Sequence, residues 1–431
     1  DASDLRKWVG ATIYGMIGLS RLYEVLQPFW DHGQIIDELL WGNKYFLNMQ
    51  EPDGYVMSHV GGDVLKHGDS NRWTDNITGD EIGTAETIKP LSGGSSSEIT
   101  ISGAKDDRVI QTRPLDRIGQ YNFIMAEAIM ARLTKQKNPS YSERCLNSAI
   151  NCFNWCVNSG NDNNPGQIGS AIESVIELYK ITESKKYLEF ALEYVNKLFK
   201  LQVKEPIDSD VPIKGFYLIS TDNPEPYLDI WHGCWHLIAI CDLIETFTDH
   251  SDVDQWKESI ALYAQNYLLD MSKRNSFGTI PYGFFSKEDP GGNRRIGKLW
   301  YRYFMKPTEG WWVGINANLA SAGVGLIKAG RILHDHNLLA IAQRQLDWIL
   351  GFNPHGSSTV DSIGYNHPKQ FINTTEFKPA TPHIPGAVMN GIGGTMDDQP
   401  DLHDGSYHTA EYWTPMVAYT LWLLAELSAI S

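Results

Sequence analysis

The sequence lacks the features that mark several large classes of protein. Its 431 residues contain no apolar run long enough to cross a bilayer and no recognisable signal peptide. Acidic side chains outnumber basic ones by 52 to 36, which gives a net charge of −16. Nucleic acids and anionic membranes select basic surfaces, so this balance argues against both as partners.

Cysteine is also scarce, and its count is odd. An odd number argues against a complete disulfide framework, and the spacing matches no compact metal site. Within each of two groups the cysteines recur at helical spacing, which is typical of buried structural thiols. The five positions are Cys145, Cys152, Cys156, Cys234 and Cys241.

Helical periodicity is what the chain has in abundance, because strand-like alternation is nearly absent outside the loops. The clearest pair of apolar stripes covers 166–200, and it predicts two consecutive helices. Further stripes cover 19–26, 35–40, 121–129, 233–247, 256–270, 317–334, 338–350 and 412–428. Together these patterns predict roughly eleven helices of ordinary length, joined alternately by short and long connections.

Two loop regions are candidates for function. The longest connection, about 53–114, is a large insertion, and loops of this length are usually functional or disordered. Within it, Trp73 is a candidate either for substrate contact or for pinning the loop to the body of the fold. A second loop, 397–404, carries four aspartates that suggest calcium, although loop acids of this kind are more often simply solvated. No zinc site is predicted.

Aromatic residues suit a carbohydrate ligand, because flat rings stack on the apolar faces of pyranoses. The chain has 14 Trp and 20 Tyr, most of which we expect to fill the core. Trp231 and His232, at the expected start of a helix, are candidate sugar contacts, whereas Trp235 and His236 one turn later fit core packing equally well. Trp311 and Trp312, just before another long helix, are candidates of the same kind.

Three short motifs in a fixed order carry a family resemblance. They are Asp1-Ala2-Ser3-Asp4, the stretch 348–354 (Trp-Ile-Leu-Gly-Phe-Asn-Pro), and Tyr407-His408-Thr409-Ala410-Glu411. Taken alone, Asp1 and Asp4 are typical of helix caps or solvated acids. Together the motifs resemble those of glycoside hydrolase family 9, the inverting cellulases and their relatives, over nearly the whole chain.

The resemblance implies an all-α fold, an (α/α)6 barrel or six-hairpin toroid with long loops on the cleft face. We expect a single catalytic domain over 1–431; the alternative is a linear array of helical hairpins. Family members often carry a strand and a small β-sandwich domain before the first motif, so we expect a mature or trimmed chain. A secreted or periplasmic location is suggested by the resemblance alone.

The resemblance also implies two carboxylates in different protonation states. An inverting glycosidase uses one as acid and one as base, roughly 6.5–9.5 Å apart. Glu411 is the expected acid, because partial burial at the start of an apolar helix raises a carboxyl pKa, although helix-start amides oppose this. Asp4 is the expected base, with Asp1 holding the water or Asp4; their division of labour is open.

The sequence departs from the family pattern near the expected cleavage site. The usual His-rich run with an Arg is not evident after 354, and His367 is its best match. Ala410 replaces the usual Asn before the acid, and Tyr407 is a further candidate contact. We expect action on β-1,4-linked glucan or gluco-oligosaccharides. Exo-action on other sugars, such as glucosamine oligosaccharides, and a noncatalytic glycan-binding barrel remain alternatives, and the oligomeric state is open.

Overall fold

The computed structural model describes residues 7–26, 33–61, 99–101, 109–208, 212–229, 231–308, 313–371 and 383–429. These residues are mainly helical. The longer helices are α1 (Val9–Leu26), α2 (Gly33–Asn48), α4 (Arg117–Thr134), α5 (Pro139–Asn158), α6 (Pro165–Thr182), α7 (Lys185–Leu201), α8 (Trp235–Thr246), α9 (Val253–Tyr263), α11 (Asn316–Leu333), α12 (His336–Ile349) and α14 (Thr414–Ser428). A π-helical segment, Ala264–Leu269, continues α9 into the short α10 (Asp270–Ser272), and α13 (Tyr407–Ala410) precedes α14.

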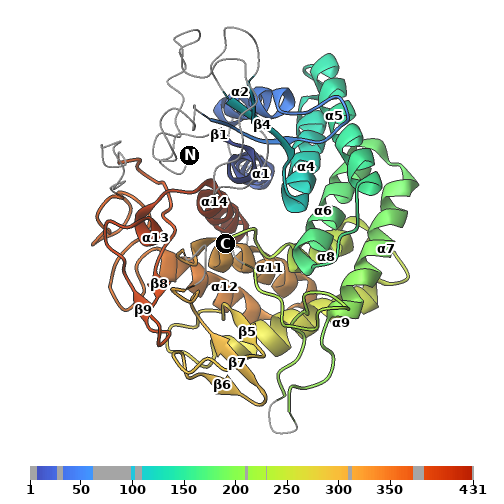
Figure 1. Cartoon of the computed structure of the whole chain (residues 1–431). Helices are drawn as coiled ribbons and strands as arrows, with labels where there is room; N and C mark the ends of the chain where they lie inside the picture. The colour runs from blue at the N-terminus through green and yellow to red at the C-terminus, as the bar shows by residue number, and fades with distance from the viewer. Residues whose placement is uncertain are drawn as a thin grey trace.

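Six of these helices form a closed inner ring. In order round the ring, α1, α4, α6, α8, α11 and α14 each contact the next, and α14 contacts α1 again. Five further helices in the described ranges lie outside the ring, with α2, α5, α7, α9 and α12 packed on α1, α4, α6, α8 and α11 respectively (Figure 1). The predicted (α/α)6 barrel is therefore confirmed. The alternative prediction, a linear array of helical hairpins, was wrong, because α1 and α14 pack against each other and close the ring.

The two layers follow from different apolar patterns. Outer helix α7 buries one stripe, which includes Tyr187, Ala191 and Leu198, and leaves its other face exposed. Inner helix α8 is buried at every position from Trp235 to Ile244, as a helix with neighbours on all sides must be. Asparagine caps followed by proline begin α5 and α6, where Asn138 and Asn164 accept backbone N–H bonds.

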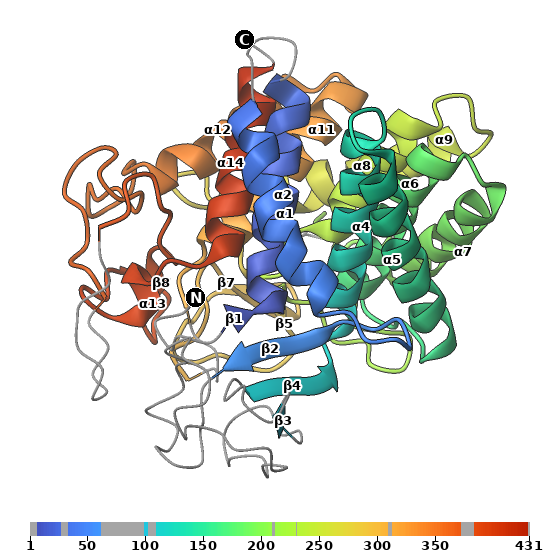
Figure 2. The ribbon, with the colours of Figure 1, turned by 90° about the horizontal axis from the view of Figure 1, so that it is seen from above.

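Helices α1 and α14 lie side by side and run in the same direction (Figure 2). Gly15 faces Thr414, and one turn later Gly18 faces Ala418 so closely that an added Cβ would lie 2.6 Å from the Ala418 Cα. Because the two helices are parallel, their first residues lie at the same end of the barrel. The chain thus begins its first helix beside the segment that holds Glu411.

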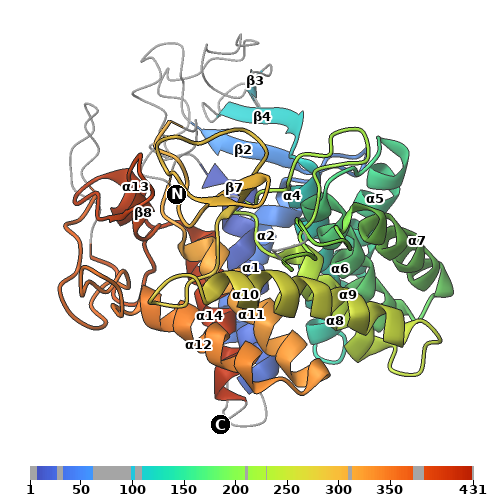
Figure 3. The ribbon, with the colours of Figure 1, turned by 90° about the horizontal axis from the view of Figure 1, so that it is seen from below.

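Short antiparallel sheets occupy the connections at that end. One sheet has the order β1-β2-β4-β3, built from β1 (Lys7–Trp8), β2 (Met57–Gly61), β3 (Ile99–Ile101) and β4 (Val109–Pro114). The others are β5-β7-β6 (Gly283–Phe285, Leu299–Arg302, Arg295–Ile296) and β8-β9 (Gly393–Gly394, Pro400–Asp401). Figure 3 shows β2, β4 and β7 at the end opposite the end of α14. The described parts of the long 53–114 connection therefore include strands.

None of the helices in the described ranges combines the length and the hydropathy that crossing a bilayer requires. All five cysteines are buried and free, as their helical spacing predicted.

Candidate active site

The structure describes half of the predicted site residues. Glu411, Tyr407, His367, Trp231 and His232 lie within the described ranges. The remaining candidates lie outside them, so their predicted roles stay predictions: Asp1, Asp4, Trp73, Trp311 and Trp312.

Glu411 lies in the gap between two helices. It follows the four-residue α13 directly, with an extended backbone (φ −76°, ψ 141°), and its residue is only 5% exposed. The prediction that it begins the final helix was wrong by three residues. Helix α14 starts at Thr414 because Trp413 is the cap residue and Pro415, in the first turn, favours a start there. The expected burial of Glu411 is present, but the expected helix-start position is not.

Backbone pairing holds the Glu411 segment in place. Asn390 donates its N–H to the Glu411 carbonyl oxygen at 2.9 Å, and its side-chain amide to the Tyr407 carbonyl oxygen at 2.7 Å. Gly391 donates its N–H to the Thr409 carbonyl oxygen at 3.1 Å. The segment before β8 therefore fixes the backbone on both sides of Ala410.

A third segment backs this pair. The Gly314 N–H donates to the His408 carbonyl oxygen at 2.7 Å, and the Asn316 N–H donates to the Asn390 carbonyl oxygen at 3.1 Å. Gly314 lies so close to Gly391 that an added Cβ would be 2.2 Å from the Gly391 oxygen. Only glycine fits at position 314, so the residues just before α11 pack directly against the backbone of Asn390 and Gly391, which holds the Glu411 segment.

Tyr412 anchors the segment from the opposite side. Neighbouring side chains on extended backbone point to opposite faces, so Tyr412 points away from Glu411. Its hydroxyl donates to Asp361 Oδ2 at 2.7 Å, and His383 Nδ1 lies 3.1 Å from Asp361 Oδ1. Burial by itself would raise the pKa of Asp361, but hydrogen bonds from Tyr412, His383 and the Ile384 N–H lower it to about 2. Asp361 is therefore a fixed anion behind the site.

Trp231 and His232 are brought next to this segment. Their rings stack at 3.9 Å, and the Trp231 ring lies 5.6 Å from that of Trp413, two residues after Glu411. The hydroxyls of Tyr14 and Tyr419 donate to the His232 carbonyl oxygen at 3.0 and 2.5 Å. Burial lowers the pKa of His232, so its imidazole is neutral at neutral pH.

The two residues do not begin a helix, as the sequence had suggested. Helix α8 starts at Trp235, because Gly233 takes a left-handed conformation (φ 98°) beneath the Tyr419 hydroxyl, where an added Cβ would lie 2.0 Å away. Trp235 and His236 are 0% and 1% exposed, so core packing is the correct interpretation for that pair.

Tyr407 borders the site on its exposed side. The Tyr407 residue is 41% exposed. The centre of its ring lies 3.8 Å from that of the His408 ring and 6.4 Å from that of the Phe371 ring. Burial raises the pKa of Tyr407, and the charge of Glu411 adds to the shift. His367 lies four residues before Phe371, with Nδ1 3.2 Å from the Ser358 carbonyl oxygen.

The acidic loop 397–404 does not converge on one point. Asp398 pairs with Arg294, Asp404 with Lys369 and Asp401 with His403. Within the described residues, no three His, Cys, Asp or Glu side chains are arranged to hold a metal ion. The calcium suggestion stays an untested prediction.

Sequence reasoning missed the supporting residues of the site: Asn390, Gly391, Gly314, Asp361 and Tyr412. Each acts through contacts with distant segments, and none lies in a recognisable motif. The Gly-rich run 391–394 was the one available signal, since glycines in a strand often mark a close backbone approach.

Comparisons with known proteins agree with this geometry. The model of glycosyl hydrolase family 9 matches residues 1–424. No match was found among curated proteins. The cellulase Cel9M of C. cellulolyticum has a TM-score of 0.60 at 15% identity, with 98% of this chain and 84% of that chain covered. A Bacteroides ovatus GH9 structure has a TM-score of 0.62 at 15% identity, with 99% of this chain and 70% of that chain covered.

An endoglucanase from the termite Nasutitermes takasagoensis gives 0.60 at 15% identity, covering 99% of this chain and 86% of that chain. At such identities the solved structures establish the fold alone. The family model covers nearly the whole sequence, including both motif-bearing ends. The chain therefore belongs to glycosyl hydrolase family 9 and is a glycosyl hydrolase.

Proposed function

We propose that the enzyme cleaves β-1,4-linked glucan or gluco-oligosaccharides with inversion at the anomeric carbon. The observation that carries this proposal is the placement of Glu411. Glu411 is nearly buried, and hydrogen bonds hold its backbone segment on both sides of Ala410. It lies at the barrel end where α1 begins, five residues after Asp4 in the sequence. The names of the similar structures, which include cellulases and endoglucanases, support the choice of substrate.

In this mechanism Glu411 is the acid. It donates its proton to the glycosidic oxygen as the bond from that oxygen to the anomeric carbon breaks. Asp4 is the base, which takes a proton from the water that attacks the same carbon from the opposite face, and Asp1 orients the water or Asp4. The two catalytic carboxyls would stand roughly 6.5–9.5 Å apart, leaving room for the water.

Aromatic residues would form the walls of the substrate site. The Trp231 ring contacts that of Trp413, two residues after Glu411, and Tyr407 begins the short helix just before Glu411, so their rings could hold sugars on the two sides of the bond being cleaved. His232 would contribute as a neutral hydrogen-bonding group, because burial lowers its pKa. His367, Trp73, Trp311 and Trp312 are proposed as further contacts on the basis of their sequence positions.

Exo-action on another sugar is the second candidate. It is favoured by the missing His-rich run with its Arg, which changes the surroundings of the sugar to be cleaved. A noncatalytic glycan-binding barrel is the third. The test must therefore separate turnover from binding and must identify the sugar.

The experiment is a comparison of hydrolysis across β-linked oligosaccharides of glucose, glucosamine and N-acetylglucosamine. We expect turnover on one sugar class, and a loss of at least about a thousandfold in Glu411→Gln, since general acid catalysis contributes up to about ten-thousandfold. Glu38→Gln, the same substitution at an exposed position on outer helix α2, is the control and should retain full activity. Glycan binding without turnover in the unaltered chain would overturn the proposal.

A further inference from the structure

Glu411 belongs to the far arm of a long hairpin, 390–411. At its base, Asn390 and Gly391 pair with Glu411 and Thr409, as described above. In its middle, the strands β8 and β9 pair through only two residues each. Such a short ladder is too weak to fix the path of a hairpin in water. Contacts at the tip, 395–399, must therefore contribute to its position.

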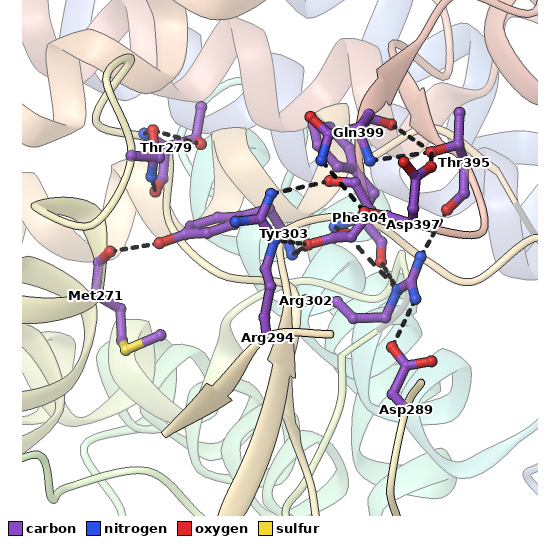
Figure 4. Close-up of polar contacts among 12 residues, drawn as sticks. Met271, Thr279, Asp289, Arg294, Arg302, Tyr303, Phe304, Thr395, Asp397 and Gln399 are labelled. Carbon is purple, nitrogen blue, oxygen red and sulfur yellow. Dashed lines mark hydrogen bonds and ion pairs between the residues drawn. The ribbon is translucent and has the colours of Figure 1, made fainter. Parts of the chain in front are cut away.

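Arg302, the last residue of β7 in the β5-β7-β6 sheet, forms hydrogen bonds to the tip (Figure 4). Its guanidinium donates to the carbonyl oxygens of Thr395 at 2.7 Å and Met396 at 3.2 Å. Asp289 Oδ2 accepts a third bond at 2.6 Å, which neutralises the buried cation. Arg302 is 1% exposed, so these are bonds in a low-dielectric interior.

Asp398, a residue of the tip, accepts hydrogen bonds from residues that flank strands of the same sheet. Its buried carboxylate accepts the N–H groups of Tyr303 at 3.0 Å and Phe304 at 3.0 Å, and Arg294 Nε at 2.7 Å. Asp398 itself holds a left-handed backbone conformation (φ 58°), which aspartate tolerates better than most non-glycine residues do. The tip is thus locked to β7 and to the residues that follow it.

The same stretch of chain also reaches the base of the hairpin. After Phe304 it leads to Gly314, whose N–H donates to the His408 carbonyl oxygen at 2.7 Å. One connection between the π-helical segment and α11 therefore touches the hairpin at its tip and again three residues before Glu411. A movement of the tip would therefore shift the hairpin, and Glu411 with it, relative to the inner helices.

We propose that Arg294, Arg302 and Asp398 are positioning residues that set the place of the Glu411 carboxyl relative to the scissile bond. The proposal rests on the acid role proposed above. Proton transfer to the leaving oxygen needs hydrogen-bond geometry, and a misplacement of about 1 Å can cost on the order of a hundredfold in rate. Loosening the tip should therefore slow the step that needs the acid.

The chain offers a matched pair of arginines for the test. The Arg294 side chain is 29% exposed and bonds to the buried Asp398, at the barrel end that carries Glu411. The Arg331 side chain is 35% exposed and bonds to the buried Glu426, on α14 near the opposite end. Arg294→Gln and Arg331→Gln thus remove the same group from equivalent surroundings and should cost similar stability, but only the first touches the hairpin.

Two substrates distinguish positioning from general damage. Cleavage of cellotetraose needs a protonated leaving oxygen, whereas 2,4-dinitrophenyl β-cellobioside releases an anion that needs no acid. For Arg294→Gln we expect kcat on cellotetraose to fall about tenfold or more, with a smaller change in KM. Its rate on the dinitrophenyl substrate should stay within about twofold, and Arg331→Gln should preserve both rates.

Asp398→Asn provides a second variant of unchanged size and should show the same selective loss. Equal kcat values for the Arg294 and Arg331 variants on cellotetraose, or equal losses on both substrates, would overturn the positioning role. Glu411→Gln is measured alongside. If it retains activity on cellotetraose, the proposed function fails; if it is inactive while both arginine variants are unimpaired, only the positioning proposal fails.

Discussion

At the scale of single residues, the surroundings of each buried carboxyl decide its charge. Glu177, on inner helix α6, lies within 2.9 Å of Arg21, Arg132 and Lys180, and these cations outweigh burial to lower its pKa. Glu127, on α4, has Asn43 as a hydrogen-bond donor at 3.2 Å. Burial raises the pKa of Glu127 to about 8, with the bond from Asn43 opposing the shift.

This difference predicts an unusual pH dependence for Glu127. Its folded pKa of about 8 exceeds the ordinary 4.5, so the folded chain binds the proton more tightly than the unfolded chain. The stability this confers is full below pH 4.5 and is lost as pH rises towards 8, amounting to on the order of 4 kcal/mol. Glu127→Gln should remove that slope. Urea unfolding at pH 5, 6, 7 and 8 measures it, and parallel slopes for both proteins would refute the assignment.

At the scale of elements, the barrel closes through backbone contact between α1 and α14. Gly18 lies directly against the Ala418 backbone, with no space for a methyl group. Gly169 on α6 has the same relation to Trp235 and His236 on α8, where an added Cβ would lie 2.5 Å from backbone atoms. The inner ring is therefore narrow at these points because glycine permits it.

Two glycine-to-alanine variants test this packing. Gly18→Ala should destabilise the fold by about 1–3 kcal/mol, because overpacking outweighs the higher helix propensity of alanine. Gly33→Ala, at the start of α2 where nothing lies within 4 Å of an added Cβ, should be neutral or slightly stabilising. Thermal unfolding of both variants decides the matter; equal melting temperatures would contradict the close packing.

The same scale shows what the sequence could and could not predict. Helical stripes located α6, α7, α11 and α12 within a few residues, because one-sided or continuous burial leaves a periodic trace. The spacing of Trp231 and Trp235 falsely extended α8, since four-residue spacing persists across a break that only the conformation of Gly233 imposes. The bonds from Asn390 and Gly314 to the Glu411 segment join distant parts of the chain and leave no local trace.

At the scale of the whole molecule, the two ends of the barrel have different chemistry. Charged side chains from all six inner helices form a layer away from the site. Both signs are present in the ring: Arg21, Arg132 and Lys328 are basic, and Glu177, Asp242 and Glu426 are acidic. Lys328 lies 2.5 Å from Asp242 and 3.8 Å from Glu426, so it links α8 to α14 through α11. Loops and short sheets occupy the other end, where we propose that the substrate binds.

The proposed chemistry lies at this second end, and it is an inverting reaction that depends on Glu411. The most direct measurement is proton NMR of the anomeric signals during the first minutes of cellotetraose hydrolysis, before mutarotation mixes the anomers. We predict that the first new reducing ends are α-anomers, and that they do not form with Glu411→Gln. Initial release of β-anomers would show retention and would contradict the two-carboxylate inverting mechanism.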